Sequence, residues 1–67
     1  MEISARNQLP GTVTSVTLGS VMAEVSLDIA GHEVVAAITR SSAERLGLKE
    51  GDTVTAFIKA TEVMIGR

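Results

Sequence analysis

VMAEVSLDI, residues 21–29, is the stretch of sequence that decides the fold. Apolar residues occupy every odd position, and most even positions are polar or charged. This strict period of two predicts a β-strand with one face toward a core and the other toward solvent. Gly19-Ser20 predicts a turn before it, and the Thr- and Val-rich residues 11–18 predict the first strand of a hairpin. The alternation of that first strand slips near Ser15, which indicates a β-bulge.

On the other side of this stretch, residues 30–32 (Ala-Gly-His) predict a second turn. Residues 33–39 are apolar at both odd and even positions, so we expect a third strand that is buried on both faces. Ser41 with Glu44 three residues later has the spacing of a capping box and predicts a short helix. Gly47 stands where a left-handed residue would end that helix.

The two ends of the chain supply the remaining strands. Residues 53–60 alternate again, and residues 62–66 predict a short final strand. Residues 3–9 predict a first strand, which Pro10-Gly11 is expected to interrupt. The result is an all-β fold: a small, five-stranded, OB-like antiparallel barrel with one short helix. An SH3-like barrel is the alternative architecture. No linker or shift in composition divides the chain, so residues 1–67 are interpreted as one domain.

Composition favours assembly into an oligomer. A chain of 67 residues buries only a small core of its own. The absence of cysteine removes disulfides and thiolate metal sites. Yet 45% of the residues are hydrophobic and the mean hydropathy is +0.30. Contacts between subunits are the remaining means of stabilising such a domain.

Several classes of function are excluded. The net charge of −2 and the single aromatic residue, Phe57, argue against nucleic acid as a partner. No apolar run has the roughly 18 residues of a membrane span, and the N-terminus is unlike a signal peptide, so a cytoplasmic protein without a membrane partner is expected. Catalysis has no support, because the lone histidine, His32, lies in a predicted turn. Glu24 and Asp28 are expected to be solvated on the outer face of their strand.

A cluster of polar residues stands out near the N-terminus. Ser4-Ala5-Arg6-Asn7-Gln8 places a hydroxyl, a guanidinium and two amides in five residues. Arg6 has two interpretations at this point: an ordinary surface charge, or the centre of an anion site. The second rests on the planar fork of donors that arginine offers to an oxyanion.

Several segments occur in the order typical of one protein family. They are Ser4-Ala5-Arg6-Asn7-Gln8-Leu9 followed by Gly11, then Ile38-Thr39, Leu46-Gly47-Leu48, Gly51-Asp52, and residues 58–65, IKATEVMI. Over essentially its whole length the chain resembles the molbindins, small molybdenum-pterin-binding proteins made of a single Mop (TOBE-type) module. The resemblance implies an OB-like barrel, in agreement with the order of elements above.

The resemblance also implies a function. Molbindins bind molybdate, with tungstate as a close mimic, and so store and buffer the oxyanion. They assemble as homohexamers, trimers of dimers, and hold the anion between subunits. No catalytic cofactor is implied, and whether a pterin binds is left open, because the family's traditional name is the sole indication of it. The alternative function is a module that senses molybdate and acts through a separate partner protein.

Site residues follow from the same resemblance. One subunit is expected to supply the Ser4 hydroxyl, the Ala5 backbone N–H and the Arg6 guanidinium. A second subunit is expected to supply the remaining groups, namely Lys59, the backbone N–H of Ala60 and the hydroxyl of Ser42. For Ser42, capping of the first turn of the short helix is an equal alternative. Relatives often carry Ser at position 60, so a side-chain hydrogen bond there is absent in this chain. A possible second anion site uses backbone amides of Gly19 and Ser20, and Asn7 is expected to order the Arg6 loop.

Overall fold

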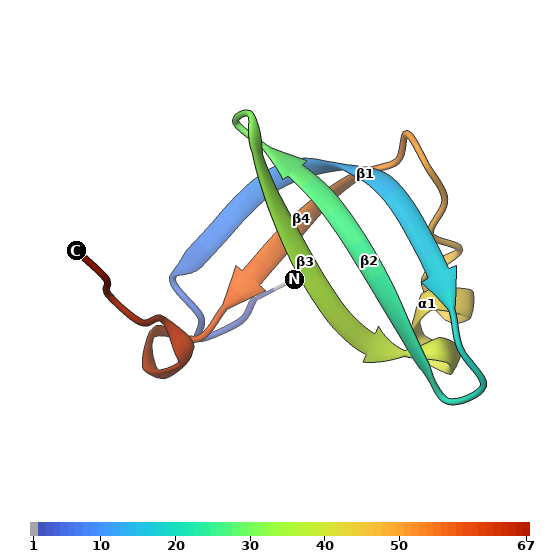
Figure 1. Ribbon diagram of the computed structural model, residues 1–67. Helices are drawn as coiled ribbons and strands as arrows, with labels where there is room; N and C mark the ends of the chain where they lie inside the picture. The colour runs from blue at the N-terminus through green and yellow to red at the C-terminus, as the bar shows by residue number, and fades with distance from the viewer. Residues whose placement is uncertain (1) are drawn as a thin grey trace.

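The computed structural model describes residues 2–67; Met1, the first residue of the expected domain, lies outside them. The described residues form one curled antiparallel sheet with strand order β3-β2-β1-β4, a short helix and a 3-10 turn (Figure 1). The elements are β1 (Asn7–Leu18), β2 (Met22–Ile29), β3 (His32–Thr39), α1 (Arg40–Leu46), β4 (Thr53–Ile58) and the 3-10 turn η1 (Ala60–Glu62). The all-β class and the helix before the last strand are confirmed, but the sheet of this chain has four strands rather than five.

The core lies on one face of β2, as its alternation predicts. Val25, Leu27 and Ile29 are buried together with Val13 of β1. The strand begins at Met22 rather than Val21, because Val21 belongs to the turn in which the Gly19 N–H donates to the Met22 carbonyl at 2.7 Å. The β-bulge is confirmed: the register between β1 and β2 shifts between Val13 and Ser15.

The expected break at Pro10-Gly11 is wrong, and β1 runs through both residues. Residues 7–12 of β1 pair with β4, whereas pairing with β2 begins only at Thr12. Pro10 therefore lies where β1 has a neighbour on one side only, and a strand tolerates the missing N–H at such a place. Gly11 is needed for close approach: a Cβ there would lie 2.7 Å from Ile29 Cγ1 and 2.9 Å from the Asp28 carbonyl oxygen.

The expectation that residues 33–39 are buried on both faces is wrong for this chain. In β3 half-buried and exposed residues alternate, and Val35 is 51% exposed. The reason is topological, since β3 is a terminal strand of the sheet and only one of its faces packs on the core. The turn before β3 is formed by Ala30 (φ 52°) and Gly31 (φ 85°), and the Gly31 N–H donates to Asp28 Oδ1 at 3.0 Å.

Helix α1 begins two residues earlier than the capping-box spacing predicts. Thr39 is the N-cap, and its hydroxyl oxygen accepts from the Ser42 N–H at 3.1 Å. Ser41 is therefore inside the helix, and Glu44 pairs with Arg40 at 3.6 Å instead of closing a capping box. Thr39 is the N-cap in place of Ser41, because strand β3 leads directly into the helix and its last residue, Thr39, supplies the capping hydroxyl. The left-handed end at Gly47 is confirmed, with φ 61° and ψ 35°.

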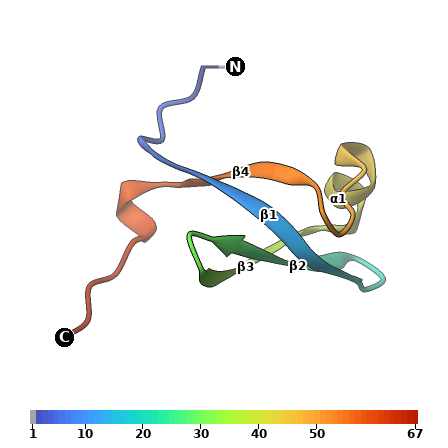
Figure 2. The ribbon, with the colours of Figure 1, turned by 90° about the horizontal axis from the view of Figure 1, so that it is seen from above.

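The C-terminal segment differs most from expectation. Strand β4 ends at Ile58, two residues before the predicted limit. Residues 60–62 form η1, and residues 63–67 form no strand, although a strand was predicted over residues 62–66. In two views 90° apart, this segment leads away from the sheet (Figures 1 and 2).

Candidate functional site

Pairing between β1 and β4 places a segment near the N-terminus beside a segment near the C-terminus. Asn7 is opposite Ile58 in the antiparallel register. The next residues beyond the two strands are Arg6 and Lys59, which lie 53 positions apart in the chain and line the same depression. The two strands thus place the cationic side chains of Arg6 and Lys59 at the same end of the sheet.

These two cations line one depression of about 190 Å³. Its lining residues are Ser4, Ala5, Arg6, Lys59, Ala60 and Thr61. Five of the six residues expected at the molybdate site therefore meet in a single chain. The Arg6 and Lys59 residues are exposed, while Ala5 is buried and anchors the segment. An anion in this depression would meet two positive charges, hydroxyl groups and backbone N–H groups.

Two side-chain hydrogen bonds hold the walls of this depression. Asn7 Nδ2 donates to the Ile58 carbonyl at 3.0 Å and so ties the start of β1 to the residue before Lys59. Gln8 Nε2 donates to the Ala5 carbonyl at 2.8 Å and fixes the turn of the segment that carries Arg6. Asn7, expected to order the Arg6 loop, bonds instead to the residue before Lys59, and the bond within the Arg6 segment is made by Gln8. Both amides use their donors on carbonyl groups, so the Arg6 segment is shaped independently of any ligand.

The electrostatics of the depression favour an anion. Within residues 2–67 the one ion pair joins Arg40 and Glu44, in helix α1. No carboxylate of the described residues therefore pairs with Arg6 or Lys59. Two like charges that converge without a counter-charge repel each other, and a bound dianion would relieve that repulsion.

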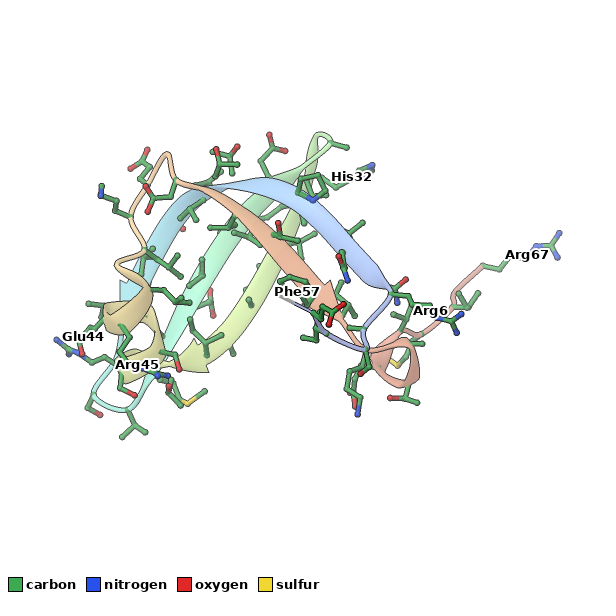
Figure 3. All side chains as sticks on the ribbon, turned by 180° about the vertical axis from the view of Figure 1, so that it is seen from behind. Arg6, His32, Glu44, Arg45, Phe57 and Arg67 are labelled. Atoms are coloured by element: carbon green, nitrogen blue, oxygen red, sulfur yellow. The ribbon has the colours of Figure 1, made fainter. Side chains whose placement is uncertain are left out.

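Ser42, the sixth expected residue, does not lie at this depression. It belongs to α1, and the view from behind shows Glu44 and Arg45 of α1 at the opposite end of the molecule from Arg6 (Figure 3). The Ser42 Oγ is engaged there by the Thr39 hydroxyl at 2.8 Å and by Arg45 Nη2 at 3.3 Å. If Ser42 contacts the same anion, it does so from another copy of the chain.

The residues of the possible second anion site lie near α1. Gly19 and Ser20 form the exposed turn between β1 and β2. The Gly19 carbonyl accepts from Arg40 Nη1 at 3.2 Å, which places a cation beside the turn. None of the three hollows of about 570, 190 and 430 Å³ is lined by Gly19 or Ser20.

Sequence reasoning missed one lining residue, Thr61. It follows Ala60 in η1 and adds an exposed hydroxyl to the depression. The sequence does contain a signal for this residue: Thr61 directly follows the expected Lys59-Ala60 pair and offers the side-chain hydroxyl that Ala60 lacks. Thr61 was not predicted because the strand expected over residues 53–60 ends one residue before it.

The larger hollow of the surface has different chemistry. It measures about 570 Å³ and is lined mainly by apolar and threonine side chains, including Leu46, Leu48 and Phe57. Its one ionisable residue, Asp52, accepts from the Lys49 N–H at 3.1 Å. A carboxylate repels an oxyanion, so this hollow is unsuited to one.

Other sites have no structural support. Across residues 2–67 no group of three His, Asp or Glu side chains is arranged to hold a metal ion. His32 is exposed at the start of β3, and Figure 3 shows it away from Arg6. Helix α1, the longest helix described, has seven residues, and none of the described helices is long and apolar enough to cross a membrane.

A small curled β-sheet whose depression is lined by two cations and by hydroxyl groups has the chemistry of an oxyanion-binding module. The sequence matches the TOBE domain family over residues 3–65, and the chain belongs to that family. It is 56% identical over 66 residues to Molybdenum-pterin-binding protein 3 of Clostridium pasteurianum, with 97% of each chain covered.

Solved structures agree with this assignment. A molybdate-binding protein from Sporomusa ovata is 48% identical and superposes with a TM-score of 0.96, with all of both chains covered. The cytoplasmic molybdate-binding protein ModG, solved with molybdate bound, is 43% identical with a TM-score of 0.85. That match covers 90% of this chain and 43% of the ModG chain. The OB-like barrel architecture expected from the order of elements is thus shared with molybdate-binding proteins.

Proposed function

We propose that this protein binds molybdate, with tungstate as a mimic, and stores and buffers the oxyanion in the cytoplasm without catalysing a reaction. One observation carries the proposal: Arg6 and Lys59 line one depression, and among the described residues no carboxylate lines it or forms an ion pair with either. Relatives that are 48% and 56% identical to this chain are named for binding molybdate or a molybdenum pterin.

The depression suits a tetrahedral dianion on chemical grounds. Arg6 offers a planar fork of N–H donors, and Lys59 offers a compact charge with three donors. The Ser4 hydroxyl and the backbone N–H groups of Ala5 and Ala60 add neutral donors. Molybdate accepts hydrogen bonds on all four oxygens, so no Cys or His ligand is needed.

The binding unit in the proposal is a homo-oligomer, a hexamer built as a trimer of dimers from single Mop modules of residues 1–67. Exposed apolar side chains support assembly: Leu18, Val21, Met22 and Val35 are each between 46% and 71% exposed. A surface of that kind on a small domain favours contacts with other chains. Ser42 is proposed to reach the anion from such a neighbouring subunit.

Selective binding is the test of this proposal. Calorimetry with molybdate, tungstate, sulfate and phosphate should show binding of the first two and rejection of the others. Sulfate has shorter bonds than molybdate, so hydrogen-bond donors placed for the larger ion would not all reach its oxygens. Phosphate is partly protonated near neutral pH, and its O–H group would face a site that offers donors and no acceptor. Sulfate that binds within tenfold of molybdate would contradict the proposal.

The alternative is a module that senses molybdate and acts through a separate partner protein. The apolar hollow beside Leu46 and Phe57 is the observation that favours it, because a partner could cover that surface. A partner that is retained only in the presence of molybdate would support sensing, whereas storage requires no partner at all.

A further inference from the structure

The six residues that line the depression of about 190 Å³ form two matching triplets. Ser4-Ala5-Arg6 precedes β1, and Lys59-Ala60-Thr61 follows β4. Each triplet contains a cation, an alanine and a hydroxyl group. Asn7 and Ile58 are the last pair in the antiparallel register of β1 and β4. Counted outward from that pair, both triplets begin with the cation and end with the hydroxyl residue, so each polar group has a counterpart in the other segment.

Alanine at the centre of each triplet adds no polar side-chain group. Ala5 is only 9% exposed and Ala60 is exposed, and neither carries a side-chain atom beyond Cβ. The side-chain donors of the depression are therefore those of the flanking residues, namely two cations, Arg6 and Lys59, and two hydroxyls, Ser4 and Thr61. Their number equals that of the oxygens of a tetrahedral oxyanion.

The 3-10 turn η1 holds Thr61 at the depression. The Glu62 N–H donates to the Lys59 carbonyl at 2.9 Å, and this bond between residues three positions apart closes one turn of backbone. Lys59 and Thr61 both belong to that turn, so the backbone sets the spacing between them. Thr61 therefore lines the depression without any help from a ligand.

The hydroxyls of Ser4 and Thr61 take no part in the side-chain hydrogen bonds of residues 2–67. Both residues are exposed. By contrast, the Thr14 hydroxyl donates to the Ser26 carbonyl, and the Thr39 hydroxyl caps helix α1. A hydroxyl that serves no bond within the protein and lines a cationic depression is available to donate to an anion.

We infer that Thr61 donates a hydrogen bond from its hydroxyl to the bound oxyanion and is, beside Ser4, the second hydroxyl donor of the depression. The inference rests on the proposed molybdate function and adds a binding residue to it. Ala60 has no hydroxyl, so Thr61 supplies the one that this segment offers. A hydrogen bond from a hydroxyl to an anion is charge-assisted, and it is stronger than one between neutral groups.

The resulting set of donors suits a tetrahedral dianion. Two cations and two hydroxyls provide one side-chain donor group for each of four oxygens. Each oxygen accepts more than one hydrogen bond, so backbone N–H groups, and Ser42 from another copy of the chain, add to this set without displacing Thr61. A planar anion with three oxygens would leave one of the four groups without a partner.

Calorimetry with molybdate tests the inference on Thr61→Val and Thr61→Ser. Valine keeps the shape of threonine without its hydroxyl and should weaken binding about tenfold, the lower end for a hydrogen bond to a charged group. Serine keeps the hydroxyl and should bind nearly as tightly as the unchanged protein. Thermal unfolding without molybdate should be the same for all three, because the Thr61 hydroxyl serves no bond within the protein. Undiminished binding by Thr61→Val, or equal losses in both variants, would overturn the inference.

Thr55→Val is the matched control. Thr55 is an exposed threonine of β4 that lies outside the depression, and its hydroxyl takes no part in the side-chain hydrogen bonds of residues 2–67. The control should bind molybdate normally. A loss equal to that of Thr61→Val would assign the effect to a general change of the surface and overturn the inference.

The same titrations separate this inference from the proposed function. If the unchanged protein binds molybdate and Arg6→Ala weakens that binding, but Thr61→Val does not, the role of Thr61 is refuted and the function stands. If the unchanged protein does not bind molybdate, the proposed function is refuted and the role of Thr61 with it.

Discussion

Removal of either cation from the depression should weaken molybdate binding while the fold survives. The substitutions are Arg6→Ala and Lys59→Ala. Both residues are exposed and have no protein partner among the described ion pairs, so their loss leaves no buried group unsatisfied. The sheet is held by Val13, Val25 and Leu27, which neither substitution touches.

The expected magnitude follows from the kind of contact that is lost. A hydrogen bond to a charged group contributes about 1.5–3 kcal/mol, which corresponds to roughly 10- to 150-fold in affinity. Solvent screening at an open depression favours the lower end, and cover by a neighbouring subunit favours the upper end. Because both side chains hold one anion, the double variant should lose less than the sum of the single losses.

Isothermal calorimetry with molybdate measures the effect, and Lys49→Ala is the matched control. Lys49 lies in the loop after α1, and its loss changes the net charge by the same amount. A distant charge is screened over about 8 Å at physiological salt, so the control should bind normally. Arg6→Lys is a sharper variant, since it keeps the charge, loses the planar fork and should lose part of the affinity.

Two results would refute this reasoning. If Arg6→Ala binds molybdate as tightly as the unchanged protein while it remains assembled, the N-terminal segment is structural. If Lys49→Ala weakens binding as much as Lys59→Ala, the affinity reflects net charge and not the depression. Either outcome would move the site elsewhere on the molecule.

Three further predictions concern the fold. Gly11→Ala should lower the free energy of unfolding by about 1–3 kcal/mol in denaturant titrations, because its Cβ would lie 2.7 Å from Ile29 Cγ1. Ala30→Asn should raise the stability by about 0.5–1 kcal/mol in thermal unfolding, because Asn tolerates the left-handed φ of 52° and suits a turn before Gly31. Thr39→Ala should cost about 1 kcal/mol through loss of the N-cap, whereas Ser41→Ala should change little; equal costs would contradict the cap at Thr39.

How far sequence predicts this fold depends on whether the deciding contact is local. The alternation of residues 21–29 and the left-handed end at Gly47 are local signals, and both are confirmed. Pro10-Gly11 is a local signal of a break, and it is wrong because pairing with β4 and close approach to Ile29 are contacts between distant segments. The N-cap was misplaced for a similar reason, since the end of β3 determines which hydroxyl reaches the helix.

The candidate site divides in the same way. No local pattern places Arg6 beside Lys59, because the register between β1 and β4 does so; the resemblance to molbindins supplied that pair. The resemblance also implied that Arg6 and Lys59 come from two different subunits. One chain already brings Arg6 and Lys59 together at one depression, whereas α1, the helix that contains Ser42, lies at the opposite end from Arg6 (Figure 3).

The position of Ser42 bears on what assembly contributes to binding. Its helix α1 lies at the opposite end of the molecule from Arg6 (Figure 3), so one chain does not bring Ser42 and Lys59 to one anion. The Ser42 oxygen accepts from Thr39 and Arg45, which leaves its own O–H free to donate. A contribution from Ser42 therefore requires a second copy that brings its α1 to the depression of the first. Such a copy would also exclude water from Arg6 and Lys59, and each hydrogen bond to the anion would strengthen as the local dielectric falls. Affinity and assembly are then thermodynamically linked, because a ligand held by two subunits stabilises their contact by the same free energy with which the contact stabilises the ligand.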